Sequence, residues 1–115
     1  MRDELCPSVY IITNKRNGTL YIGVTSELHK RIWDHKNGTN PGFSKQYGLG
    51  TLGWFEHHPS MPSAIHREKR LKKWRRAWKL ELINAMNPDS KDLHEEIDAN
   101  INLVEEFVSR KVEPR

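Results

Sequence analysis

Two short apolar stretches separated by a polar one open the chain. Residues 9–13 and 19–24 are rich in β-branched and aromatic side chains, which favour strands. Between them, residues 14–18 are polar and end on Gly18, which can adopt the positive φ that tight turns use. The pattern predicts an antiparallel β-hairpin.

A short helix is predicted directly after the hairpin. Residues 25–27 supply N-capping side chains and an early acidic charge, and the Asn37-Gly pair is a common helix end. We therefore expect a helix over about residues 28–36. Arg31 precedes His35 by four positions, so their Cβ atoms lie about 5–6 Å apart on the helix surface.

The second half of the chain alternates one more strand with helical segments. Residues 51–56 predict a third strand. Residues 63–86 contain no Gly or Pro and carry apolar positions at helical spacing, which predicts one long helix, or two joined by a bend near Trp74. Residues 87–90 break the helical pattern. An acidic tail follows, with a predicted helix over about residues 93–109.

Composition restricts the class of protein. A chain of 115 residues is the size of one domain, and 36% hydrophobic content with four Trp suits a small, well-filled core. The net charge of +4 favours a polyanionic partner such as nucleic acid. Cys6 is the only cysteine, which excludes an internal disulfide framework and a cysteine-based zinc site. No apolar run predicts a membrane span and the first residues do not resemble a signal peptide, so we expect a cytoplasmic protein without membrane association.

Four residues in the first third of the chain are candidates for chemistry. Tyr10 and Tyr21 lie in the two hairpin strands, where each by itself is more often an ordinary strand aromatic than a catalytic residue. Arg31 and His35 share one side of the following helix, where each alone is typical of a solvated face. Together they suit phosphate chemistry, because a guanidinium matches phosphate oxygens and an imidazole can hydrogen-bond a tyrosine hydroxyl.

Glu68 is a candidate ligand for a divalent cation. It is the only carboxylate in residues 67–79, a stretch with eight Lys and Arg residues. It lies three positions from both Ile65 and Leu71, so we expect it on the side of the helix that packs inward. An ion pair with Lys72, four positions on, is a plausible alternative role. One carboxylate, completed by water and phosphate oxygens, is nevertheless a common way of holding Mg²⁺.

These motifs, in this order, resemble the GIY-YIG nuclease superfamily over residues 8–89. Residues 21–23, Tyr-Ile-Gly, match the second motif of that family. Residues 9–11, Val-Tyr-Ile, keep the tyrosine of the first motif, but Ser8 stands where the family has glycine. Residues 64–69 resemble the family's glutamate helix.

The resemblance implies an α+β fold, a three-stranded antiparallel sheet flanked by helices, as in small single-domain members of the family. The predicted order strand–strand–helix–strand–helix agrees with it. Residues 1–89 are then the GIY-YIG-like nuclease domain. Residues 90–115 are an acidic, helical C-terminal extension of the same domain and contribute an extra helix.

The resemblance also implies a function, the hydrolysis of nucleic-acid phosphodiester bonds by a metal-dependent endonuclease. Its implied metal ligand is Glu68, its metal Mg²⁺ or Mn²⁺, and its products a 5′-phosphate and a 3′-hydroxyl. Its partner is nucleic acid, DNA in preference to RNA. Asn87 enters the site because some members use an asparagine after the glutamate helix, although ending a helix before a proline is an equally good role for it. The implied catalytic set is Tyr10, Tyr21, Arg31, His35, Glu68 and Asn87.

Several cations are candidates for contacts with the nucleic-acid backbone. Usually such a basic run is a solvated helix face, but Lys and Arg side chains on one surface also suit phosphates. The candidates are Lys36, Lys45, Lys69, Lys72 and Arg76.

Two other functions stay open at this stage. The chain can be a nucleic-acid-binding module with weak catalysis, whose binding depends on salt. It can also be an interaction protein that uses its acidic C-terminal helix, as a homodimer or with another protein.

Overall fold

A computed structural model describes residues 6–15, 18–37 and 50–97 of the chain. Lys45 and residues 98–109 of the predicted C-terminal helix lie outside the described residues. Among the residues described, no helix is both long and apolar enough to cross a membrane.

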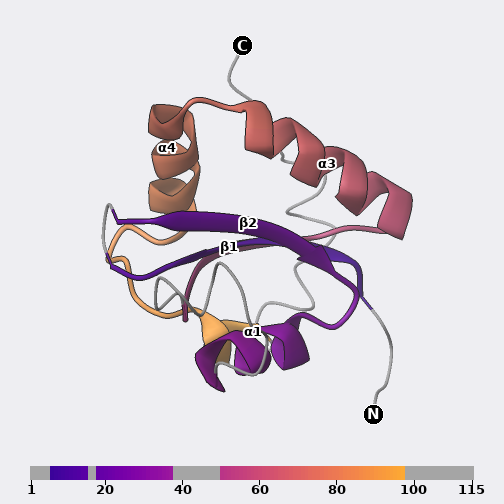
Figure 1. Cartoon of the computed structure of the whole chain (residues 1–115), viewed down its shortest axis with the longest axis horizontal. Coiled ribbons are helices and arrows are strands. Elements are labelled where there is room, and N and C mark those ends of the chain that lie inside the picture. The colour runs from indigo at the N-terminus through magenta and orange to yellow at the C-terminus, as the bar shows by residue number, and fades with distance from the viewer. Residues whose placement is uncertain (1–5, 16–17, 38–49, 98–115) are drawn as a thin grey trace.

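Three strands form one antiparallel sheet: β1 (Ser8–Thr13), β2 (Leu20–Thr25) and β3 (Thr51–His57). The order is β2-β1-β3, so β1 lies in the centre and β2 at an edge (Figure 1). All six residues of β1 are buried, as its unbroken apolar pattern predicts. The predicted hairpin and third strand are confirmed, each within one residue of its expected bounds.

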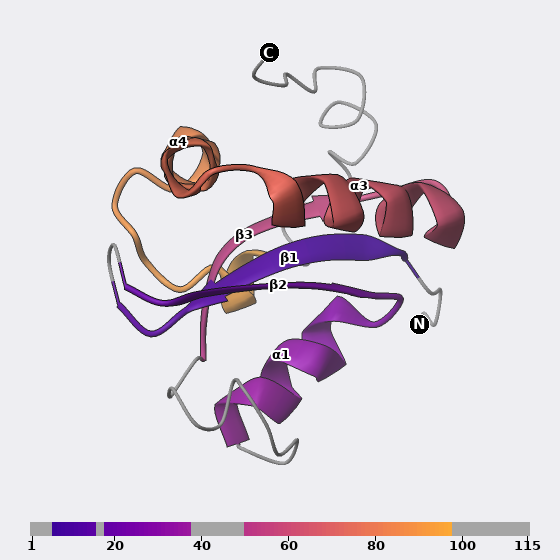
Figure 2. The same cartoon turned by 45° about the horizontal axis from the view of Figure 1, so that its top comes forward.

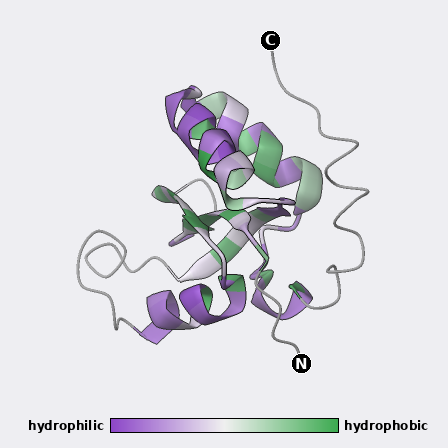
Figure 3. Cartoon of the chain, turned by 90° about the vertical axis from the view of Figure 1, so that its right-hand side faces the viewer, coloured by the Kyte–Doolittle hydropathy of each residue, from purple (hydrophilic) through white to green (hydrophobic). Residues whose placement is uncertain are grey.

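The sheet lies between two helical layers (Figures 1 and 2). One face is covered by α1 (Leu28–Asn37), and the other by α3 (Met61–Lys73) and α4 (Arg76–Met86). Strand residues alternate between the two faces, so there are two apolar clusters. Figure 3 shows green hydrophobic positions in the strands, between the helical layers. The predicted α+β class with a three-stranded antiparallel sheet flanked by helices is confirmed.

The long helical stretch is two helices rather than one. The backbone becomes extended at Trp74 (φ −69°, ψ 148°) and Arg75 (φ −69°, ψ 157°), which turns α4 away from α3. The bend therefore falls where the apolar pattern placed it. Ser60 caps the start of α3 by accepting a hydrogen bond from the Ser63 amide at 3.2 Å.

The segment after α4 packs onto the domain. Leu93 and Ile97 are buried in the cluster on the α1 face, and the Leu93 amide donates to the carbonyl of Leu52 at 2.9 Å. Between them, His94–Glu96 form a single 3₁₀ turn rather than the α-helix predicted from residue 93. The predicted start of the C-terminal helix at residue 93 is therefore wrong. Asp92 accepts hydrogen bonds from the amides of both Leu52 and His94, which holds this segment against the sheet.

Candidate active site

Tyr10, Tyr21 and His35 meet on the face of the sheet that α1 covers. The Tyr10 hydroxyl is hydrogen-bonded to Nε2 of His35 at 3.1 Å. The ring centroids lie 6.5 Å apart for the two tyrosines, 5.8 Å for Tyr10 and His35, and 5.7 Å for Tyr21 and His35. The fold therefore brings one side chain each from β1, β2 and α1 into direct contact.

Gly23 makes room for this arrangement. It pairs with Tyr10 across β1 and β2. A Cβ at position 23 would lie 2.4 Å from the Tyr10 hydroxyl oxygen and 2.5 Å from Cζ, far inside ordinary contact distance. The tyrosine thus extends over the backbone of Gly23 toward the edge strand. The sequence signal was the glycine of the Tyr-Ile-Gly motif, but its spatial reason was not evident before the strands were paired.

The ionisation of Tyr10 and His35 is set by burial and by two nearby charges. Burial, and then the neighbouring Tyr21, strongly raise the pKa of Tyr10; the charge of Arg31 lowers it and that of Glu68 raises it. Burial, followed by the charge of Arg31, lowers the pKa of His35. His35 is therefore neutral at pH 7, and its Nε2 can accept the hydrogen bond that the Tyr10 hydroxyl donates.

Arg31 and Glu68 reach Tyr10 electrostatically from different helices. Arg31 is exposed on α1, and its positive charge acts on both Tyr10 and His35. Glu68, on α3, has a side chain only 13% exposed, and its carboxylate forms an ion pair with Lys72 at 2.9 Å. The expected ion pair with Lys72 is thus present, and the charge of Glu68 also raises the pKa of Tyr10.

The inward face of α3 differs from the one we expected. Ile65 is 37% exposed, whereas Ala64, Arg67 and Leu71 are buried. The apolar spacing misplaced this face because a buried arginine takes a position that hydrophobicity assigns to the surface. Glu68 lies at the margin of the buried face, not at its centre.

The donor set suits a hard cation and not a structural zinc site. Among the described residues, no group of three or more His, Cys, Asp and Glu side chains can hold a metal ion. A single, largely buried carboxylate, Glu68, fits the way Mg²⁺ is held by one carboxylate together with water and phosphate oxygens. Binding there requires Lys72 to leave the carboxylate or to share it.

Asn87 makes buried hydrogen bonds that hold the end of α4 in place. Its side-chain amide donates to the carbonyls of Gly53 at 3.3 Å and Lys91 at 2.7 Å, and its Oδ1 accepts from the Lys91 amide at 3.1 Å. With 2% exposure it fastens the end of α4 to β3 and to the following loop. Its predicted part in catalysis stays a prediction, and we leave it out of the site.

The predicted phosphate-binding cations are spread over several elements. Lys36 forms an ion pair with Asp92 and donates to the Gly50 carbonyl at 3.0 Å. Lys69 is exposed on α3. Arg76 donates to the Gly18 carbonyl at 2.6 Å from the start of α4.

A buried ionic network that the sequence analysis missed fixes α3 on the sheet. Glu56 of β3 accepts hydrogen bonds from Arg67 at 3.1 and 3.4 Å and is bonded to His58 at 2.7 Å. The Arg67 guanidinium lies 5.9 Å from the Trp54 ring and 5.4 Å from the Trp74 ring. Burial alone would raise the pKa of Glu56, but the His58 hydrogen bond and the Arg67 charge outweigh it and hold the pKa below its usual value. The network thus fixes Arg67, the residue that directly precedes Glu68 in α3.

Ser8, which replaces the glycine of the first motif, has a structural partner. Its hydroxyl lies 2.7 Å from Nδ1 of His57, and the Cys6 sulfur lies 3.3 Å from the same nitrogen. Burial, and then the charge of His58, lower the pKa of His57 to about 4. The serine therefore gives Nδ1 of a buried neutral histidine on the neighbouring strand a hydrogen-bond partner, a pairing that no local pattern signals.

Two curated relatives are similar to this chain over most of its length. UPF0213 protein CPE1444 of Clostridium perfringens is 34% identical over 90 residues, covering 78% of this chain and 96% of the relative. UPF0213 protein SSP2268 of Staphylococcus saprophyticus is 33% identical over 76 residues, covering 66% and 92%. The solution NMR structure of UPF0213 protein BH0048 from Bacillus halodurans is similar with a TM-score of 0.48 and 23% identity, over 84% of this chain and 97% of that one.

The family model described as the GIY-YIG catalytic domain matches residues 6–81. The match spans all three strands, α1, α3 and the first half of α4. It therefore includes Tyr10, Tyr21, Arg31, His35 and Glu68, but not Asn87. This chain belongs to the GIY-YIG catalytic domain family, whose domains are of the nuclease type.

Proposed function

We propose that the protein is a metal-dependent endonuclease that hydrolyses phosphodiester bonds in nucleic acid, DNA in preference to RNA. The observation that carries the proposal is the 3.1 Å hydrogen bond between the Tyr10 hydroxyl and His35 Nε2. The charge of Arg31 acts on both of these residues, and the charge of Glu68 acts on Tyr10. A buried tyrosine paired with a neutral imidazole, beside a cation and a carboxylate, supplies the parts needed for phosphoryl transfer to water.

Tyr10 and His35 work as a proton relay in this proposal. A tyrosine whose pKa is raised by burial does not ionise by itself at neutral pH, so it cannot act alone as a base. The attacking water gives its proton to the Tyr10 oxygen while the Tyr10 hydroxyl proton passes to His35 Nε2. The imidazole becomes imidazolium and then releases this proton to solvent, as its lowered pKa favours, while the leaving 3′ oxygen takes a proton from solvent.

The remaining residues bind and orient the phosphate. Arg31, exposed beside the pair, contacts the non-bridging oxygens as negative charge develops on them. Tyr21, packed against His35, hydrogen-bonds the water or the phosphate. Glu68 holds the Mg²⁺ or Mn²⁺ ion, which when bound neutralises charge on the phosphate and the leaving oxygen.

A cleavage panel tests the proposal. Labelled duplex, branched and single-stranded DNA and RNA are incubated with Mg²⁺, Mn²⁺ or chelator, using wild type, Tyr10→Phe and Glu68→Gln. We expect metal-dependent cleavage that either variant lowers by at least 100-fold. Glu81→Gln, an exposed carboxylate on α4, is the matched control and should cleave like wild type. Full activity of Tyr10→Phe would remove Tyr10 from the mechanism.

A second candidate, a nucleic-acid-binding module with weak catalysis, is favoured by one contact. Lys72 is paired with the Glu68 carboxylate that the metal requires. If that ion pair persists, the protein binds nucleic acid in a salt-dependent way but does not cleave it at any metal concentration. Absence of cleavage together with tight, salt-sensitive binding would select this function.

A further inference from the structure

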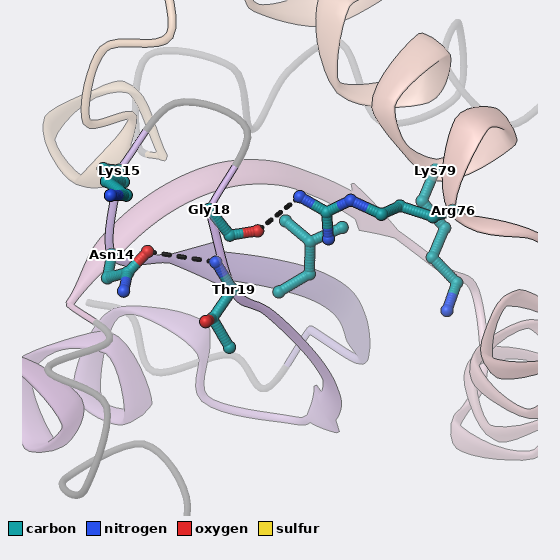
Figure 4. Close-up of a pocket in the computed structure, with 7 residues that line it drawn as sticks. Asn14, Lys15, Gly18, Thr19, Arg76 and Lys79 are labelled. Carbon is teal, nitrogen blue, oxygen red and sulfur yellow. Dashed lines mark hydrogen bonds between the residues drawn. The ribbon is translucent and has the colours of Figure 1, made fainter.

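A basic pocket lies between the β1–β2 turn and the start of α4. Its volume is about 550 Å³. Figure 4 shows Arg76 reaching across from α4 to the carbonyl of Gly18, and the Thr19 amide donating to the Asn14 side chain. These two hydrogen bonds, of 2.6 and 3.1 Å, connect α4 to Gly18 and connect Thr19 to Asn14, just after the end of β1. The described residues that line the pocket are Asn14, Lys15, Gly18, Thr19, Leu20, Arg76 and Lys79.

The charged side chains among the described residues that line the pocket are all cationic. Lys15, Arg76 and Lys79 line it, and none of the described lining residues is acidic. Burial, and then the charge of Arg76, lower the pKa of Lys79, which means that the two cations disfavour each other. An anion in the pocket would relieve this repulsion. The hydroxyl of Thr19 adds an uncharged hydrogen-bond donor suited to a phosphate oxygen.

The pocket is close to the candidate active site along the edge strand. Thr19 is two residues from Tyr21, a distance of about 7 Å along β2 at the rise of an extended strand. Leu20, which also lines the pocket, packs with the α3 and α4 cluster, whereas Tyr21 packs on the α1 side. The pocket and the candidate active site therefore both border on β2, which has no strand on its outer side in the described sheet. A nucleic-acid strand lying over this edge can contact both.

We propose that this pocket binds a backbone phosphate of nucleic acid at a position away from the bond that is cleaved. The choice of ligand rests on the proposed function, but the pocket itself does not. No aromatic side chain and no carboxylate is present among the lining residues described. The contact is therefore made to the backbone, so it adds affinity equally for all sequences.

The salt dependence of binding tests the proposal without any need for cleavage. Affinity for a fixed duplex is measured from 50 to 200 mM salt in a Glu68→Gln background, alone and with Lys15→Gln or Lys79→Gln. Each lost phosphate contact should reduce the slope of log K against log salt by about 0.9. Raising the salt from 50 to 200 mM should therefore weaken nucleic-acid binding by each pocket variant about 3–4-fold less than it weakens binding by the parent protein. Lys91→Gln, an exposed lysine outside the pocket, should leave the slope unchanged.

Titration with pyrophosphate, followed by NMR of the wild-type protein, separates the pocket from the nuclease. We expect amide shifts concentrated at Gly18, Thr19 and Lys79. Unchanged slopes in both pocket variants would overturn the proposal, even if pyrophosphate binds there and wild type still cleaves. Reduced slopes in a protein that never cleaves would support the pocket while the proposed hydrolysis fails. A wild-type protein that binds no nucleic acid would overturn both proposals.

Discussion

Replacing Gly23 by alanine should damage the Tyr10–His35 pair more than any other methyl-sized change in the sheet. The added Cβ would lie 2.4 Å from the Tyr10 oxygen, so the hydroxyl must move by about 1 Å to reach ordinary contact. Tyr10 is 2% exposed and has little free space. A shift of that size disturbs the 3.1 Å hydrogen bond to His35, whose strength depends on distance and angle. Overpacking of this kind costs about 1–3 kcal/mol.

Urea unfolding and cleavage assays measure the two consequences. We expect Gly23→Ala to lose about 1–3 kcal/mol of unfolding free energy and at least tenfold in cleavage rate. Gly53→Ala is the matched control: it is also a buried strand glycine, but its Cβ would meet Thr13 at 3.5 Å and Ile83 at 3.8 Å, which are ordinary contacts. That variant should be neutral or slightly stabilised, since glycine weakens a strand.

A double-mutant cycle decides whether Tyr10 is the cause. In a Tyr10→Leu background the ring atoms that crowd position 23 are absent, so Gly23→Ala should cost little further stability. An equal penalty in both backgrounds would refute the reasoning, because it would place the damage in the β2 backbone rather than at Tyr10.

Three other predictions concern residues around the site. The pKa of folded His57 is about 4, below its unfolded value, so protonating it lowers the unfolding free energy by roughly 3 kcal/mol. This stability is present above pH 6.5 and is lost as the pH falls toward 4. His57→Gln should flatten the pH dependence of urea unfolding in that window, and an unchanged profile would contradict this. Asn87→Ala should lower the unfolding free energy by about 1–3 kcal/mol, because it removes buried hydrogen bonds. If Asn87 is only structural, the folded variant keeps the wild-type cleavage rate; a loss of rate without a loss of stability would support its predicted catalytic role. Lys72→Gln should reduce severalfold the Mg²⁺ concentration for half-maximal cleavage, because it releases the Glu68 carboxylate; a higher requirement would show that the ion pair does not compete with the metal.

Local patterns determined much of the fold. Strands and helices depend on neighbours a few positions apart, so apolar runs and caps located β1, β2, β3 and α1 within one residue. The bend at Trp74 was visible as one of two options in the same pattern. Arg31 and His35 share a helix, so their proximity also followed from spacing alone.

Interactions between distant parts of the chain decided the rest. The sequence placed Ile65 on the buried face of α3, but Arg67 is buried there because Glu56, 11 residues earlier, receives its hydrogen bonds. Ser8 meets His57 across 49 residues, and Asn87 meets Gly53 across 34. Such pairs form only when the strands take their register, so no local pattern records them.

The sequence by itself therefore determined the element order, the family and the residue types of the site. Only the tertiary structure decided that Tyr10 lies over Gly23, that Asn87 is fully used in holding α4, and that Lys15 and Lys79 face one pocket. The physical reason is that periodicity reports which side of an element is apolar, whereas a site depends on which elements pack together and at what register.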